Sequence, residues 1–207
     1  MAGDARDGIE LGWSDATVPL HTHACFYYAD EQTLKVTLSF LRLGLESEGD
    51  FNVLFADRNR HELLLGWLQD GLAGDVGKAR DAGKLAVIGA APTREELLAG
   101  IGSTLEAALT RGHRRIRFLG FIGWGEPGWP DEDELLEFES QVNAAVMAYP
   151  AVIICTYGVP NLTGRQLVNG GLMTHPVVFL NGRTLTESPL YLAPAIRTAG
   201  PPAGRSG

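Results

Sequence analysis

The chain has 207 residues, 45% of them hydrophobic and 20% charged, which is the balance of a folded domain with a substantial apolar core. Seventeen lysines and arginines against 25 aspartates and glutamates give a net charge of −8. Because such a surface repels phosphate groups, we expect no direct nucleic-acid partner and no membrane-surface partner. The sequence has no secretory pattern at its start and no apolar run of the ~18 residues that cross a bilayer, so we predict a cytoplasmic protein.

Strand-like apolar runs alternate with helical patterns along the whole chain. The strands are predicted at 24–28, 51–56, 84–90, 115–121 and 151–157. The helices are predicted at 30–45, 60–72, 94–109, 131–149 and 162–172, with Asp30, Thr93 and Asp131 at three of their starts. The segment 177–185 carries Asn181-Gly182, which predicts a hairpin turn. Such alternation is typical of crossover units that build a mainly parallel sheet covered on both faces.

These elements predict one α/β domain of three layers, with a mainly parallel central sheet and a C-terminal hairpin. We place an N-terminal extension at 1–19, the domain at 20–192 and a disordered tail at 193–207, where core-forming residues are lacking.

The loop after the strand at 115–121 contains Gly123-x-Gly125-x-x-Gly128, the spacing of a dinucleotide-binding fingerprint. Its two prolines have no N–H to offer, and acidic residues 131–134 occupy the following helix start, where they would repel phosphate. We therefore interpret the loop as a glycine-permitted connection. Trp124 and Trp129 beside it either wall an apolar pocket or pack in the core. The sequence has no G-x-x-x-x-G-K-[ST] motif, which argues against an ordinary ATPase.

The chain has five histidines: His21, His23, His61, His113 and His175. Three of them could converge on a metal, but no H-x-x-x-H or paired-cysteine spacing supports it, so we predict neither a metal nor a cofactor. His23 and His175 lie beside apolar strands. There they either hydrogen-bond backbone groups or, if they face a cavity, orient a ligand.

No catalytic residue is predicted. Cys155 with a histidine is the only serious nucleophilic pair, but it lies in the apolar run "AVIICTY", where burial makes a thiol inert. Cys25 and Cys155 are both predicted to be buried free thiols. Glu137 and Glu139 are two residues apart on a helix and therefore face different sides.

Four stretches, in this order and spacing, resemble one known family: "HACFYYADEQTLKVTLSFLRLGL", "GKLAVIGA", "RIRFLGFIGWG" with the later "FESQVN", and "VIICTYGVP…LMTHPVVFLNG". Over residues 20–192 the chain is similar to the MEDS domain, a sensory domain of methanogens and methylotrophs. The resemblance implies a RecA-like fold that has lost its phosphate loop. It also implies the sensing of small molecules, often hydrocarbon derivatives.

The family pattern implies seven ligand-binding residues in this chain: His23, Cys25, Tyr28, Trp124, Cys155, Tyr157 and His175. The chain departs from the pattern at Phe121, where many relatives carry an acid, and at Ser188-Pro189, where they carry Asn-Pro. Phe121 makes any pocket less polar and puts the ligand of the family in doubt.

We therefore predict a non-catalytic sensory module that binds a small apolar or weakly polar molecule and acts on a separate kinase or transcription regulator. A degenerate nucleotide hydrolase or metal-dependent hydrolase is one alternative, and a protein-interaction module without a ligand is another. By analogy with RecA-like folds, association as a homodimer is expected.

Overall fold

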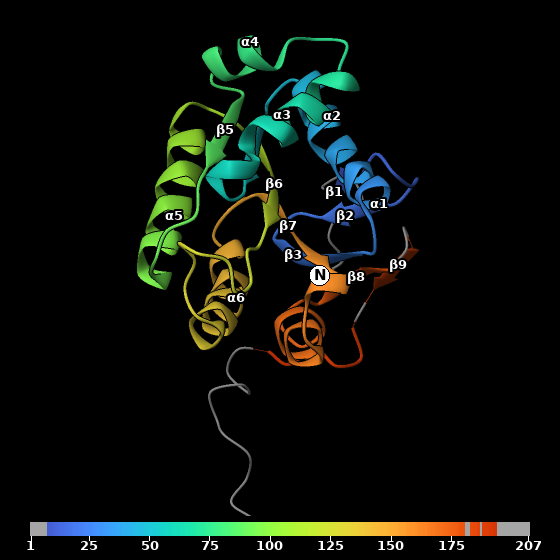
Figure 1. Ribbon diagram of the computed structural model, residues 1–207. Coiled ribbons are helices and arrows are strands. Elements are labelled where there is room, and N and C mark those ends of the chain that lie inside the picture. Colours follow the sequence, from blue (N-terminus) through green and yellow to red (C-terminus); the bar gives the residue numbers. More distant parts are fainter. Residues whose placement is uncertain (1–7, 181–182, 187, 194–207) are drawn as a thin grey trace, which may run out of the picture.

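The computed structural model describes residues 8–180, 183–186 and 188–193, with the side chains of all but 183–186 (Figure 1). Within these residues, seven strands form one sheet in the order β5-β4-β6-β7-β3-β8-β9. In that order, their bounds are as follows: β5 Leu85–Ile88, β4 Asp50–Phe55, β6 Arg115–Phe121, β7 Ala151–Gly158, β3 Thr22–Tyr28, β8 Val177–Leu180 and β9 Arg183–Thr186. All neighbours pair in parallel except β8 and β9, which pair antiparallel. The prediction of a mainly parallel α/β sheet is confirmed.

Helices cover both faces of the sheet (Figure 1). Apolar residues of α5 (Arg94–Thr110) and α6 (Glu132–Val146) belong to one core cluster. Those of α1 (Glu31–Val36), α2 (Leu38–Glu46), α3 (His61–Asp70) and α4 (Val76–Asp81) belong to the other. Strand β7 lies at the centre of the sheet and is buried along its whole length, as the apolar run "AVIICTY" predicts.

The expected helix starts are present. Asp30, Thr93 and Asp131 cap α1, α5 and α6, and each side chain accepts a hydrogen bond from the backbone N–H three residues later. Such a cap satisfies one of the N–H groups that a helix start leaves without a partner. Local sequence alone fixes this feature, which is why it could be predicted.

The helices differ from the expectation in two places. The predicted helix 30–45 is interrupted at Thr37, whose N–H and hydroxyl both bond to the carbonyl oxygen of Leu34, at 3.0 and 2.7 Å. This tightened turn separates α1 from α2. Helix α4 was not predicted, because it is only six residues long and has a single buried residue, Val76.

A small hairpin precedes the main sheet. Strand β1 (Gly8–Glu10) pairs antiparallel with β2 (Thr17–Pro19), within the stretch that the sequence indicates as an extension. Ile9, Leu11 and Val18 from this hairpin are buried in the core cluster that α1–α4 also share. The hairpin therefore covers one face of the sheet.

The chain after β7 has an unusual helix. Residues Gln166–Leu172 form η3, a π-helix, in the region where an ordinary helix is predicted at 162–172. Strands β8 and β9 give the expected C-terminal antiparallel pair, while the turn Asn181-Gly182 and the tail from 194 lie outside the described residues. Within the described part of the chain, no helix has the length and apolar character needed to cross a membrane.

Candidate functional site

A pocket of about 390 Å³ opens where three parallel strands, β3, β6 and β7, end. Its lining comes from the residues after β3, from α3, from Phe121 at the end of β6 and from Pro160 and Asn161 after β7. In parallel α/β sheets this edge is where ligands bind, and the volume suits a small molecule. We call it the carboxyl-edge pocket.

Tyr28 and Arg60 form one polar side of the pocket, and Asp30, Glu31 and Asn161 are its other polar lining residues. The Arg60 guanidinium acts electrostatically on Tyr28 and forms an ion pair with Glu126 in the loop after β6. Burial raises the pKa of the Tyr28 phenol, so its hydroxyl stays protonated at neutral pH. Gly158, at the end of the neighbouring strand, allows the tyrosine to lie close, because a Cβ there would be 2.8 Å from the Tyr28 oxygen.

The helix start beside this pocket is acidic. Asp30 caps α1, with its Oδ1 2.7 Å from the N–H of Thr33, and Glu31 follows in the first turn. A phosphate group needs free N–H groups and a positive helix end at such a place. Here a carboxylate already occupies the helix start.

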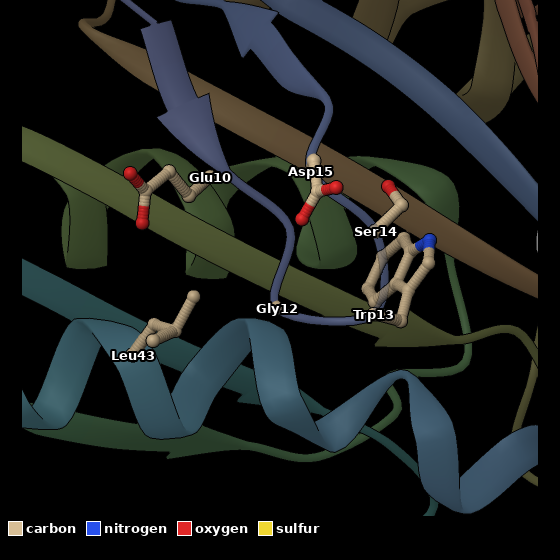
Figure 2. Close-up of a pocket in the computed structure, with 6 residues that line it drawn as sticks. All are labelled: Glu10, Gly12, Trp13, Ser14, Asp15 and Leu43. Carbon is tan, nitrogen blue, oxygen red and sulfur yellow. The ribbon is translucent and has the colours of Figure 1, made fainter.

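A second cavity, of about 550 Å³, lies between the β1–β2 hairpin and α2 (Figure 2). Glu10, Ser14 and Asp15 line it with polar groups, and Leu43 rises toward it from α2 (Figure 2). Gly12 is required at its base: φ is +83°, and a Cβ there would lie 2.9 Å from Ser39. Its lining is more polar than that of the carboxyl-edge pocket.

Four chemically reactive side chains meet in the interior. His23 comes from β3, Glu139 from α6, Cys155 from β7 and His175 from the segment before β8, and each is at most 2% exposed. One ligand atom from each lies within 4.8 Å of the other three. We call these residues the buried cluster.

The cluster centres on Nε2 of His23 and Oε2 of Glu139, which are 3.3 Å apart. Cys155 Sγ lies 3.3 Å from the same histidine nitrogen. His175 Nε2 lies 3.5 Å from the same carboxylate oxygen. The two imidazole rings are tilted by 44° with centroids 3.9 Å apart.

Burial sets the protonation of the cluster. It lowers the pKa of both His23 and His175 to about 3, so both imidazoles are neutral at physiological pH. Burial, reinforced by the charge of Glu139, raises the pKa of the Cys155 thiol well above its usual value. As it stands, Cys155 is a thiol and not an activated nucleophile.

Hydrogen bonds hold the cluster from outside. Tyr157 donates its hydroxyl to Oε1 of Glu139 at 2.9 Å and lies at the same distance from the carbonyl oxygen of Gly170. Nδ1 of His175 lies 2.9 Å from the carbonyl oxygen of Gly171 and 2.7 Å from Oγ1 of Thr174. Both carbonyls come from the π-helix η3, so its widened turn positions two members of the cluster.

The seven residues that the family pattern indicates occupy different places. His23, Cys155 and His175 belong to the buried cluster, and Tyr157 bonds to it. Cys25 is directly opposite Cys155 on the adjacent strand. The remaining two are Trp124, which packs on Tyr157 with ring centroids 6.1 Å apart, and Tyr28, which lines the carboxyl-edge pocket.

Glu139 is the cluster residue that sequence reasoning missed. Its expected separation from Glu137 is confirmed, since Glu137 is 65% exposed and Glu139 is fully buried. A signal was present, because Glu139 lies four residues after Leu135 and three before Val142, on the apolar stripe of α6. A carboxylate on such a stripe indicates a polar interior site.

The glycine-rich loop serves tryptophan packing. A Cβ at Gly123 would lie 2.3 Å from Nε1 of Trp129, so only glycine fits beneath that indole. Trp129 in turn packs on Phe55, with ring centroids 5.2 Å apart, and Trp124 is buried on Tyr157. Of the two readings of the tryptophans, core packing is the one that the structure shows.

The family model of the MEthanogen/methylotroph, DcmR Sensory domain (MEDS) matches residues 22–176. Among solved structures, a KaiC-like protein from the hyperthermophilic archaeon Pyrococcus horikoshii OT3 is similar, with 17% identity and a TM-score of 0.53. The likeness covers 77% of this chain and 70% of that chain and, at this identity, shows a RecA-like fold alone. Comparison with curated proteins gives no match.

Proposed function

We propose that this chain, which belongs to the MEDS family of sensory domains, binds a small and largely apolar molecule in the carboxyl-edge pocket and signals to a separate regulatory protein. The observation that carries the proposal is the pocket itself, formed where the parallel strands β3, β6 and β7 end. Family membership supports a sensory role. The identity of the ligand and of the partner is part of our proposal.

The lining favours an uncharged ligand. Leu63, Trp67 and Phe121 contribute apolar side chains to the pocket. Burial of apolar surface contributes roughly 25 cal/mol per Å² before the cost of association, so such walls supply most of the affinity. Tyr28 then orients the ligand through its hydroxyl.

The chemistry of this edge supports binding over catalysis. The acidic start of α1 repels the phosphates that a nucleotide hydrolase must hold, which counts against that alternative. The charged groups that line the pocket are already engaged: Asp30 accepts from the N–H of Thr33, Glu31 pairs with Lys35, and Arg60 pairs with Glu126. A non-catalytic sensor therefore fits this lining.

The same contacts offer a route for the signal. Arg60, at the start of α3, joins Tyr28 to Glu126 in the loop before α6. A ligand signals only by favouring one of two conformations. Here a ligand that displaces Arg60 from Tyr28 or from Glu126 would favour a second conformation of this loop. We propose that a kinase or transcription regulator reads that change on the adjacent surface.

The proposal is tested with ¹⁵N-labelled protein and a panel of chlorinated methanes and short alcohols. We expect saturable chemical-shift changes at Tyr28, Arg60 and the Trp67 indole. Trp67→Ala should weaken the binding at least tenfold. The control is Met147→Ala, because Met147 is exposed at the end of α6, and this variant should bind like the wild type. Shift changes that Trp67→Ala leaves intact would refute the assignment of this pocket.

A further inference from the structure

We propose that the buried cluster of His23, Glu139, Cys155 and His175 is a structural metal site that holds one Zn²⁺. The inference goes beyond the sensory function and concerns residues outside the carboxyl-edge pocket. It also departs from the sequence-based prediction of no metal, which relied on the spacing of ligands along the chain.

The distances fit a four-coordinate ion. Zinc bonds of about 2.0–2.1 Å to nitrogen or oxygen and about 2.3 Å to sulfur, in a tetrahedron, separate neighbouring ligand atoms by about 3.3 to 3.7 Å. The separations from His23 Nε2 to Cys155 Sγ and to Glu139 Oε2 are both 3.3 Å, and Glu139 Oε2 to His175 Nε2 is 3.5 Å. Small shifts of side chains that are already gathered would complete the site.

The tautomer of His175 points its lone pair at the site. Thr174 donates its hydroxyl to the carbonyl oxygen of Gly170, so its Oγ1 can only accept from Nδ1 of His175. The carbonyl oxygen of Gly171 is an acceptor too, so Nδ1 carries the proton. Nε2 of His175 therefore faces Oε2 of Glu139 with a lone pair, and a cation placed between them would bond to both atoms.

The surrounding bonds are those that metal ligands need. A ligating histidine usually donates its other N–H to a carbonyl, as His175 does to Gly171. A ligating carboxylate is usually hydrogen-bonded as well, as Glu139 is by Tyr157. These bonds fix the direction of the ligand atoms before any metal arrives.

Charge balance favours a divalent ion. Neutral imidazoles are the form that binds metal, and a proton on Nδ1 of His175, beside the carbonyl oxygen of Gly171, leaves Nε2 available as a ligand atom. On binding, Cys155 releases its proton to solvent and bonds through the thiolate, while Glu139 binds as a carboxylate. Two anionic and two neutral ligands cancel the charge of Zn²⁺, so the buried site has no net charge.

The ligand set selects the metal and its role. Two imidazoles, a thiolate and a carboxylate in a tetrahedron suit zinc better than magnesium or calcium, which prefer oxygen. Four protein ligands leave no open position for water or substrate, so the site is structural rather than catalytic. It would tie α6 to strands β3 and β7 and to the segment before β8.

Untagged protein, expressed with added zinc and dialysed against metal-free buffer, should contain one zinc per chain by elemental mass spectrometry. Glu139→Gln and Cys155→Ser should each lose most of that zinc. The matched controls are Glu137→Gln, two residues away on the exposed face of the same helix, and Cys25→Ser, opposite Cys155, and both should retain it.

Metal exchange tests the site in the wild-type protein. The proposal can therefore still be refuted if the variants fail to fold. Cobalt-substituted wild-type protein should show an intense tetrahedral visible spectrum and a thiolate charge-transfer band in the near ultraviolet. Folded wild-type protein that contains no zinc and gains no thermal stability from added zinc would overturn the proposal, and a proton shared by Glu139 and His175 would then explain the cluster. Ligand binding at the carboxyl-edge pocket is read from other residues, so the two proposals can fail separately.

Discussion

Arg117 and Asp50 form an ion pair inside the fold, with Nε of the arginine 2.8 Å from Oδ2 of the aspartate. Asp50 is fully buried and Arg117 is 3% exposed. The same guanidinium donates from Nη1 to the carbonyl oxygens of Glu10 and Phe40, at 2.6 and 3.2 Å. One side chain on β6 thus fastens the β1–β2 hairpin and α2 to the sheet.

Asp50→Asn should destabilise the protein strongly, because it leaves the guanidinium of Arg117 buried without its counter-charge. Loss of one partner of a buried pair costs about 3 to 5 kcal/mol of unfolding free energy. Urea unfolding followed by circular dichroism measures the change. The control is Glu31→Gln, which removes the exposed ion pair with Lys35 and should shift the urea midpoint little. Equal midpoints for the two variants would contradict the role given to Arg117.

Gly123→Ala should displace the Trp129 indole, because the new methyl group would lie 2.3 Å from Nε1. Overpacking of this kind costs about 1 to 3 kcal/mol. The expected readouts are a red shift of tryptophan emission and a lower midpoint of thermal unfolding. An unchanged emission spectrum together with an unchanged midpoint would contradict the close contact between Gly123 and Trp129.

Gly66→Ala should have the opposite effect. Gly66 lies within α3 and a Cβ there meets no atom within 4 Å. Alanine in a helix interior is favoured over glycine by about 0.5 to 1 kcal/mol, since it has less backbone freedom to lose on folding. Thermal unfolding should show a higher midpoint than for the wild type, and a lower one would indicate a contact that α3 makes at this position.

Tyr157→Phe should weaken zinc binding, because it removes the hydroxyl that orients Glu139. Loss of such an outer hydrogen bond lowers metal affinity by about 10- to 100-fold. Competition with a chromophoric chelator measures the affinity. Tyr27→Phe is the matched control, since the Tyr27 hydroxyl bonds to the carbonyl oxygen of Leu167, and it should bind zinc like the wild type. Equal affinities for the two variants would show that Glu139 needs no support from Tyr157.

The sequence predicted those elements that local chemistry decides. The strand 115–121 was predicted with the bounds that β6 has, and the caps Asp30, Thr93 and Asp131 were found from residue type and position. The interruption at Thr37 was missed because a threonine bonds back to the helix only in some contexts. The hairpin β1–β2 was missed because its three-residue strands are too short to show a period.

The sequence by itself determined the alternation of the main strands and helices, the lack of a phosphate loop and the apolar character of the central strand. Hydrophobic period, capping residues and motifs are local properties, so they can be read along the chain. Only the tertiary structure decided that His23 and Cys155, 132 positions apart, meet with Glu139 and His175 in one cluster. Strand order and the docking of α6 on the sheet set that meeting, and both result from packing over the whole domain, which no single stretch of sequence encodes.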